Sequence, residues 1–161
     1  MIGNDQAVPD IIRLLPDADQ HDLLRSTLQR VNLASNAART AALDQHVDGG
    51  ADLRAIVKAE AERFKVPAGL MTATARRVQE SLTGAPGRRQ KFGEYQSITL
   101  PAASLKWGAS DRVSMPTGSG RRTIRVYVDP QRGGLRPPLE GRPASLVFRN
   151  GEFELVAADD E

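Results

Sequence analysis

The sequence lacks cysteine altogether, contains only two histidines, His21 and His46, and is poor in aromatic residues, at 4% of the chain. Without cysteine the chain can form no disulfide, no thiolate metal site and no cysteine nucleophile. Two histidines are too few for a zinc site with three histidine ligands. These absences exclude several classes of metalloprotein and of covalent catalyst.

Long hydrophobic runs are also missing. The uncharged apolar stretches, such as residues 66–75, are far shorter than the roughly 20 residues that a transmembrane helix needs. The N-terminus has no basic start followed by an apolar run, so it does not resemble a secretory signal. We therefore expect a cytoplasmic protein that does not insert into a membrane.

The supply of large apolar side chains is modest. Apolar residues make up 40% of the 161 residues, but 21 of them are alanine. Such a length and composition suit one domain with a small core rather than a large enzyme.

Charge is distributed unevenly along the chain. The formal net charge of +2 combines −1 over residues 1–85, +8 over residues 86–149 and −5 over residues 150–161. Of the 22 basic residues, 18 are arginine, whose planar fork of donors suits phosphate and stacks on bases. A basic block of this kind is typical of a nucleic-acid partner, although an ordinary solvated surface remains the alternative.

The spacing of apolar residues predicts an α+β chain, with helices in its first half and strands in its second. After a short strand at residues 8–15, three helices are expected over residues 17–43, 52–65 and 67–82. A loop rich in glycine and proline follows at residues 83–89. Beyond it the apolar period changes from that of a helix to that of a strand, most clearly in residues 121–128.

Two hairpins are expected in the second half. Residues 117–120 join one pair of alternating segments. The other turns at Asn150-Gly151, a preferred type I′ pair. Its register sets three pairs of residues opposite each other: Phe148 and Phe153, Leu146 and Leu155, and Arg149 and Glu152.

No group of residues suggests catalysis. Asp17, Asp19 and Asp22 are explained by the first turn of a helix, where the helix dipole favours negative charge, and Asp52 is a candidate N-cap. Neither histidine has a nucleophile or an acid at a suggestive spacing. We therefore expect no enzyme activity, no metal site and no cofactor.

The strand at residues 121–128 is the strongest candidate for binding. Alternation puts Arg121, Arg125 and Tyr127 on one face, where cations can hold a nucleic-acid backbone and an aromatic ring can stack on a base. The alternative is an exposed strand face on which Tyr127 shields the sheet. With the basic residues nearby, the candidate nucleic-acid-binding residues are Arg88, Arg89, Lys91, Lys106, Arg112, Arg121, Arg122, Arg125 and Tyr127.

Several motifs, in order, resemble a known family. Residues 11–20 (IIRLLPDADQ) and 31–38 (VNLASNAA) are similar to the first strand and asparagine-bearing helix of TnpB proteins, transposon-associated RNA-guided DNA nucleases related to type V CRISPR effectors. Three later stretches are similar to the helix pair, strand entry and last hairpin of the same region: residues 57–78, 98–114 and 141–155.

The resemblance implies a fold and a partner. In that family this region is a wedge barrel with a helical recognition insert that contacts guide RNA and the guide–target duplex. It implies one wedge-like domain over residues 1–161: a small antiparallel β-barrel from residues 8–15 and 88–157, with a three-helix insert at residues 17–83 after the first strand. The expected partners are a guide-like RNA or an RNA–DNA duplex.

The family's RuvC-type nuclease domain and its zinc-binding segment have no counterpart before Glu161. The expected function is therefore nucleic-acid binding without catalysis, with a separate nuclease chain as a further possible partner. The alternative is a protein-interaction adaptor that uses the alanine-rich helical face at Ala34, Ala38 and Ala42.

Overall fold

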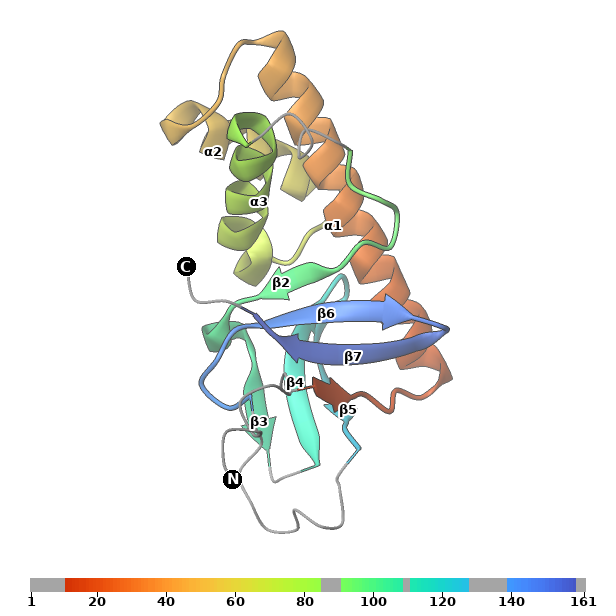
Figure 1. Cartoon of the computed structure of the whole chain (residues 1–161). Helices are drawn as coiled ribbons and strands as arrows, with labels where there is room; N and C mark the ends of the chain where they lie inside the picture. Colours follow the sequence, from red (N-terminus) through yellow and green to blue (C-terminus); the bar gives the residue numbers. More distant parts are fainter. Residues whose placement is uncertain (1–10, 85–90, 109–110, 128–138, 159–161) are drawn as a thin grey trace.

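The computed structural model describes residues 11–84, 91–108, 111–127 and 139–158, which form an α+β structure (Figure 1). Strand β1 (Ile11–Arg13) precedes helices α1 (Ala18–Asp44), α2 (Gly50–Arg63) and α3 (Met71–Thr83), the last entered through the 3₁₀ turn η2 (Ala68–Leu70). The second half contains β2 (Ile98–Leu100), the 3₁₀ turn η4 (Ala102–Ser104), β3 (Lys106–Gly108), β4 (Arg112–Thr117), β5 (Gly120–Arg125), β6 (Ala144–Arg149) and β7 (Glu152–Ala157).

The strands form two antiparallel sheets, and the prediction of a closed barrel is wrong. One sheet has the order β1-β7-β6-β2 and the other the order β3-β4-β5. Among the described residues the two sheets are linked by a single bridge between Leu14 and Val126. On the other side, Pro101 and η4 separate β2 from β3. A proline has no N–H to donate, and a 3₁₀ turn changes the chain direction, so pairing does not continue there.

Helix α1 is held by the sheets as well as by the other helices. Its first half contributes Leu24, Leu28 and Val31 to the core of the two sheets, whereas Ala38 and Ala42 pack with α2 and α3. Figure 1 shows α1 running from the sheets to the far end of the helices. The helices follow β1 in the chain, but the first half of α1 lies in the core of the sheets, so the predicted three-helix insert is not confirmed.

Local sequence explains where the helices begin. Asp17 caps α1 in a capping box: its side chain accepts the backbone N–H of Gln20 at 2.8 Å, and the Gln20 side chain accepts that of Asp17 at 3.1 Å. Helix α2 starts earlier than expected, with Gly49 at the N-cap and Asp52 in the first turn. The carboxylate of Asp52 is favourable there because it faces the positive end of the helix dipole.

Both predicted hairpins are confirmed. In β6 and β7, Phe148 pairs with Phe153, Leu146 with Leu155 and Arg149 with Glu152. The turn residues Asn150 and Gly151 have φ values of 54° and 79°, as a type I′ turn requires. Strands β4 and β5 pair through the turn at Thr117 to Gly120.

We expect Gly151→Ala to lower the free energy of unfolding by about 1–2 kcal/mol, because an L-residue is strained at positive φ. Gly69→Ala is the matched control: its added Cβ meets nothing within 4 Å and its φ is not positive. Urea unfolding of both variants checks this. Equal losses at the two positions would contradict it.

No helix in the described part of the chain is both long and apolar enough to span a bilayer.

Candidate nucleic-acid interface

The outer face of the sheet β3-β4-β5 gathers four of the predicted binding residues: Lys106, Arg112, Arg121 and Arg125. Residues directly opposite each other in antiparallel strands project to the same face. The register places Lys106 beside Ser114, and Arg112 between Gly108 and Arg125. Lys106, Arg112 and Arg125 are all exposed. The opposite face of the same strands carries Val113 and Ile124, which are buried in the core.

Arg112 and Arg125 form a like-charge pair across β4 and β5. Like charges directly opposite in a sheet are destabilising, with backbones about 5 Å apart. The carboxylate of Asp111 lies 3.8 Å from Nε of Arg112, but both side chains are largely exposed, at 46% and 63%, so this pair contributes little. Arg125 has no ion-pair partner among the described residues. The register thus places the positive charges of Arg112 and Arg125 side by side, with too little negative charge nearby to neutralise them.

Arg121 belongs to the same face but is already bound within the protein. Its Nη2 donates to the carbonyl oxygens of Ser104 at 2.6 Å and Ser114 at 2.9 Å, and its Nε donates to Oγ of Ser114 at 3.1 Å. These bonds hold β5 to β4 and to the turn before β3. They leave fewer N–H groups for a ligand than Arg112 and Arg125 offer.

Arg122 lies on the other face, opposite Met115, and donates to the carbonyl oxygen of Arg121 at 2.8 Å. The structure therefore separates Arg122 from Arg125, although both were predicted as binding residues.

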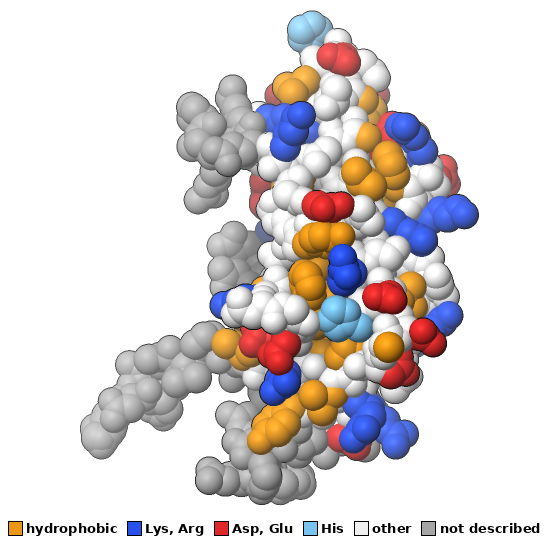
Figure 2. Space-filling model, turned by 90° about the vertical axis from the view of Figure 1, so that its right-hand side faces the viewer, with side chains coloured by type: hydrophobic (Ala, Val, Ile, Leu, Met, Phe, Trp, Pro, Cys, Tyr) orange, Lys and Arg blue, Asp and Glu red, His pale blue; other side chains and the backbone are white. Residues whose placement is uncertain are grey.

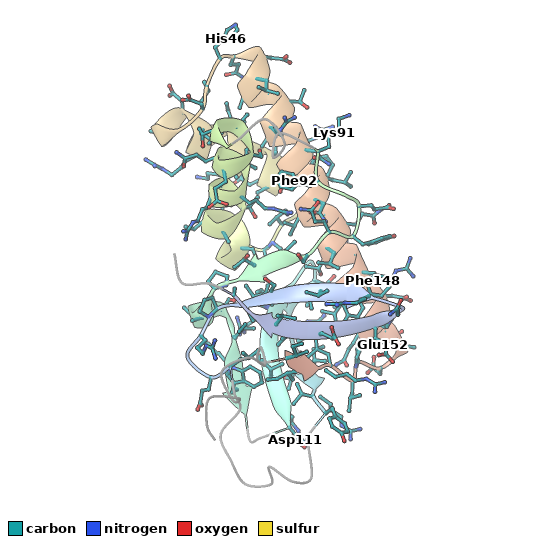
Figure 3. All side chains as sticks on the ribbon, viewed as in Figure 1. His46, Lys91, Phe92, Asp111, Phe148 and Glu152 are labelled. Carbon is teal, nitrogen blue, oxygen red and sulfur yellow. The ribbon has the colours of Figure 1, made fainter. Side chains whose placement is uncertain are left out.

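The remaining candidates are dispersed. Tyr127, 54% exposed, follows β5, where its N–H donates to the carbonyl oxygen of Arg13 at 2.9 Å. Lys91 lies beside α1, far from Asp111, which immediately precedes β4 (Figure 3). Arg88 and Arg89 fall outside the described residues.

A second group, which the sequence did not predict, consists of Arg25, Tyr95 and Phe148. The Arg25 guanidinium lies 5.3 Å from the ring centre of Tyr95 and 6.0 Å from that of Phe148, and its Nη2 donates to the Tyr95 hydroxyl at 3.3 Å. This hydrogen bond raises the pKa of Arg25. Such cation–π contacts attract the guanidinium to the faces of the aromatic rings. Only the placement of Phe148 opposite Phe153 hinted at it in the sequence.

His21 joins the last hairpin to α1. Its Nε2 lies 2.9 Å from the carbonyl oxygen of Gly151, and its ring packs edge-on against Phe153 and Phe148, with ring centres 5.1 and 5.8 Å away. Figure 2 views the molecule from the side of α1 and shows basic, acidic and apolar side chains interspersed there.

Arg77 of α3 lies largely inside the fold. Its Nη1 donates to Oδ1 of Asn32 at 2.8 Å, its Nη2 lies 3.4 Å from the carbonyl oxygen of Ser97, and its guanidinium stacks 4.0 Å from the ring centre of Phe92. Burial lowers the pKa of Arg77 to about 10, because the charged form loses water. The Arg77 guanidinium therefore stays positively charged at neutral pH. All of its partners in these contacts are neutral.

The alanine-rich face that the adaptor alternative requires is already in use. Ala34, 1% exposed, lies in the core with the sheets, and Ala38 and Ala42 are fully buried against the other helices. This burial removes the surface that the adaptor alternative depended on.

No protein-family model matches this chain, and no curated protein matches it significantly. Within the described residues, no three acidic or histidine side chains lie together as a metal site would require.

Proposed function

We propose that this protein is a nucleic-acid-binding module that holds phosphates on the outer face of β3-β4-β5 and does not itself catalyse a reaction. The observation that carries the proposal is the Arg112–Arg125 pair, with Lys106 on the same exposed face. A phosphate between two opposed guanidinium groups relieves their repulsion and accepts hydrogen bonds from both.

The arrangement suits recognition of a backbone rather than of a base sequence. The face offers cations and the hydroxyls of Ser114 and Thr123, with one aromatic residue, Tyr127, beyond its edge. Contacts to phosphate and sugar position a nucleic acid but carry no sequence information. A guide-like RNA or an RNA–DNA duplex, bound in the cytoplasm by its shape, agrees with the resemblance to the wedge region of TnpB proteins. A separate chain would then supply any nuclease.

The test is a fluorescence anisotropy titration of the whole chain with a labelled RNA hairpin and with an RNA–DNA duplex, at several salt concentrations. If three cations each neutralise a phosphate, log K should fall against log salt with a slope of about −2 to −3. Binding that does not depend on salt, or no binding at low salt, would overturn the proposal.

A further inference from the structure

A groove on another side of the molecule is a second candidate site. It has a volume of about 890 Å³ and lies between α3 and one end of the four-stranded sheet. Figure 1 shows α3 standing over β2 at this place, close to where the last described residues leave β7. Volumes of this order are typical of sites for small organic ligands.

One wall of the groove is a positively charged face of α3. Arg76 and Arg77 both line it. Arg77 is bound only by neutral oxygens and the Phe92 ring in its described contacts. Arg76 contacts Glu80, also in the wall, through Nε at 3.3 Å, with both side chains more than half exposed. That exposed pair is weak, and the terminal nitrogens of Arg76 make no described bond, so the wall keeps a net positive charge.

The opposite wall offers hydroxyl groups and flat apolar surface. Thr99 of β2 and Ser145 of β6 are directly paired in the sheet, so both side chains lie on the same face, and both line the groove. Thr72 adds a third hydroxyl from α3. Between these polar groups the lining consists of small or flat apolar residues, namely Ala73, Pro101, Ala102 and Pro143. Cations on α3, hydroxyls on the sheet and on α3, and small apolar residues in the lining match a ligand with a phosphate, a sugar and a flat ring.

We propose that this groove binds a nucleoside monophosphate group, with its phosphate on the terminal nitrogens of Arg76 beside the charge of Arg77, and its sugar against Thr99 and Ser145. Arginine suits this role because its fork can make two hydrogen bonds to one phosphate. The site shares no residue with the outer face of β3-β4-β5 and therefore stands apart from the function proposed above.

The experiment is a titration of the isotope-labelled whole chain with AMP, followed by NMR, with adenosine as the probe that lacks the phosphate. We expect AMP to shift the backbone amide signals of Thr72, Thr99 and Ser145, and adenosine to shift them much less. Arg76→Gln, an exposed change, should weaken AMP binding about tenfold.

The matched control is Arg54→Gln, which removes an exposed arginine of α2 outside the groove, and it should leave AMP affinity unchanged. An Arg112→Gln/Arg125→Gln variant should also keep full AMP affinity, which separates this site from the sheet face. Equal shifts with adenosine and AMP, shifts elsewhere only, or no loss in Arg76→Gln would overturn the proposal.

Discussion

Replacing Asn32 by alanine is expected to lower the free energy of unfolding by about 2–4 kcal/mol, the largest effect of any single polar residue discussed above. The Asn32 side chain is 1% exposed. Its Nδ2 donates to the carbonyl oxygens of Glu94 and Gln96, at 3.1 and 3.0 Å, and its Oδ1 accepts from Arg77. One amide therefore joins α1, α3 and the segment that leads into β2.

The size of the effect follows from what the substitution leaves behind. An alanine cannot replace the lost donors and acceptor, so two carbonyl groups and a buried guanidinium lose a partner where water has poor access. An unsatisfied buried polar group costs about 1–3 kcal/mol, and a charged one costs more. Asn32→Asp should also destabilise the protein: its carboxylate can pair with Arg77, but it cannot donate to either carbonyl group.

Chemical denaturation of the variants measures this effect, with Gln29→Ala as the control. Gln29 bonds the same segment, at Oε2 of Glu94, but from the exposed side of α1, so its loss should change stability by less than about 0.5 kcal/mol. A loss below about 1 kcal/mol in Asn32→Ala would show that the amide does not hold the three segments together.

The second large effect concerns the sheet face. Arg112→Gln/Arg125→Gln is expected to flatten the slope of log K against log salt for RNA by about two units, since each arginine is proposed to hold one phosphate. The same variant should be as stable as the original chain or slightly more so, because it removes a like-charge pair that is worth roughly 0.2–1 kcal/mol. Weaker binding together with undiminished stability distinguishes a binding surface from a structural one.

Two controls locate this effect. Arg122→Gln removes one charge from the same strand on the opposite face and should change the salt slope by much less than either outer-face arginine. Arg54→Gln, on α2, should not change it. The measurement is anisotropy at several salt concentrations, with unfolding curves for each variant. An unchanged slope in the double variant would exclude the outer face from the site.

Local pattern accounts for the parts of the structure that the sequence predicted well. The alternation that separates Arg125 from Ile124 and the Asn150-Gly151 turn with its register depend on residues close together in the chain. Side-chain direction in a strand and backbone angle in a turn are set within a few residues. Such features can therefore be derived without the rest of the molecule.

Part of the candidate site could be derived in the same way. The alternation grouped Arg121 with Arg125 correctly on one face. It could not show that Arg121 is bound to Ser104 and Ser114, nor that Arg112 stands opposite Arg125. Both features depend on which strands pair and on the register of the pairing. Several registers satisfy the same apolar pattern, so the sequence does not choose between them.

The sequence by itself thus determined the types of the elements, the last hairpin, and the placement of Arg121 and Arg125 on the face of β5 opposite Ile124. Only the tertiary structure decided that the strands form two sheets instead of a barrel. It also decided that Asn32 and Arg77 meet, that Arg25 reaches Tyr95, and that α3 and β2 border a groove. Asn32 and Arg77 lie 45 residues apart in the chain, and Arg25 and Tyr95 lie 70 residues apart. Contacts over such separations come from the packing of whole elements around a shared core, which no local pattern encodes.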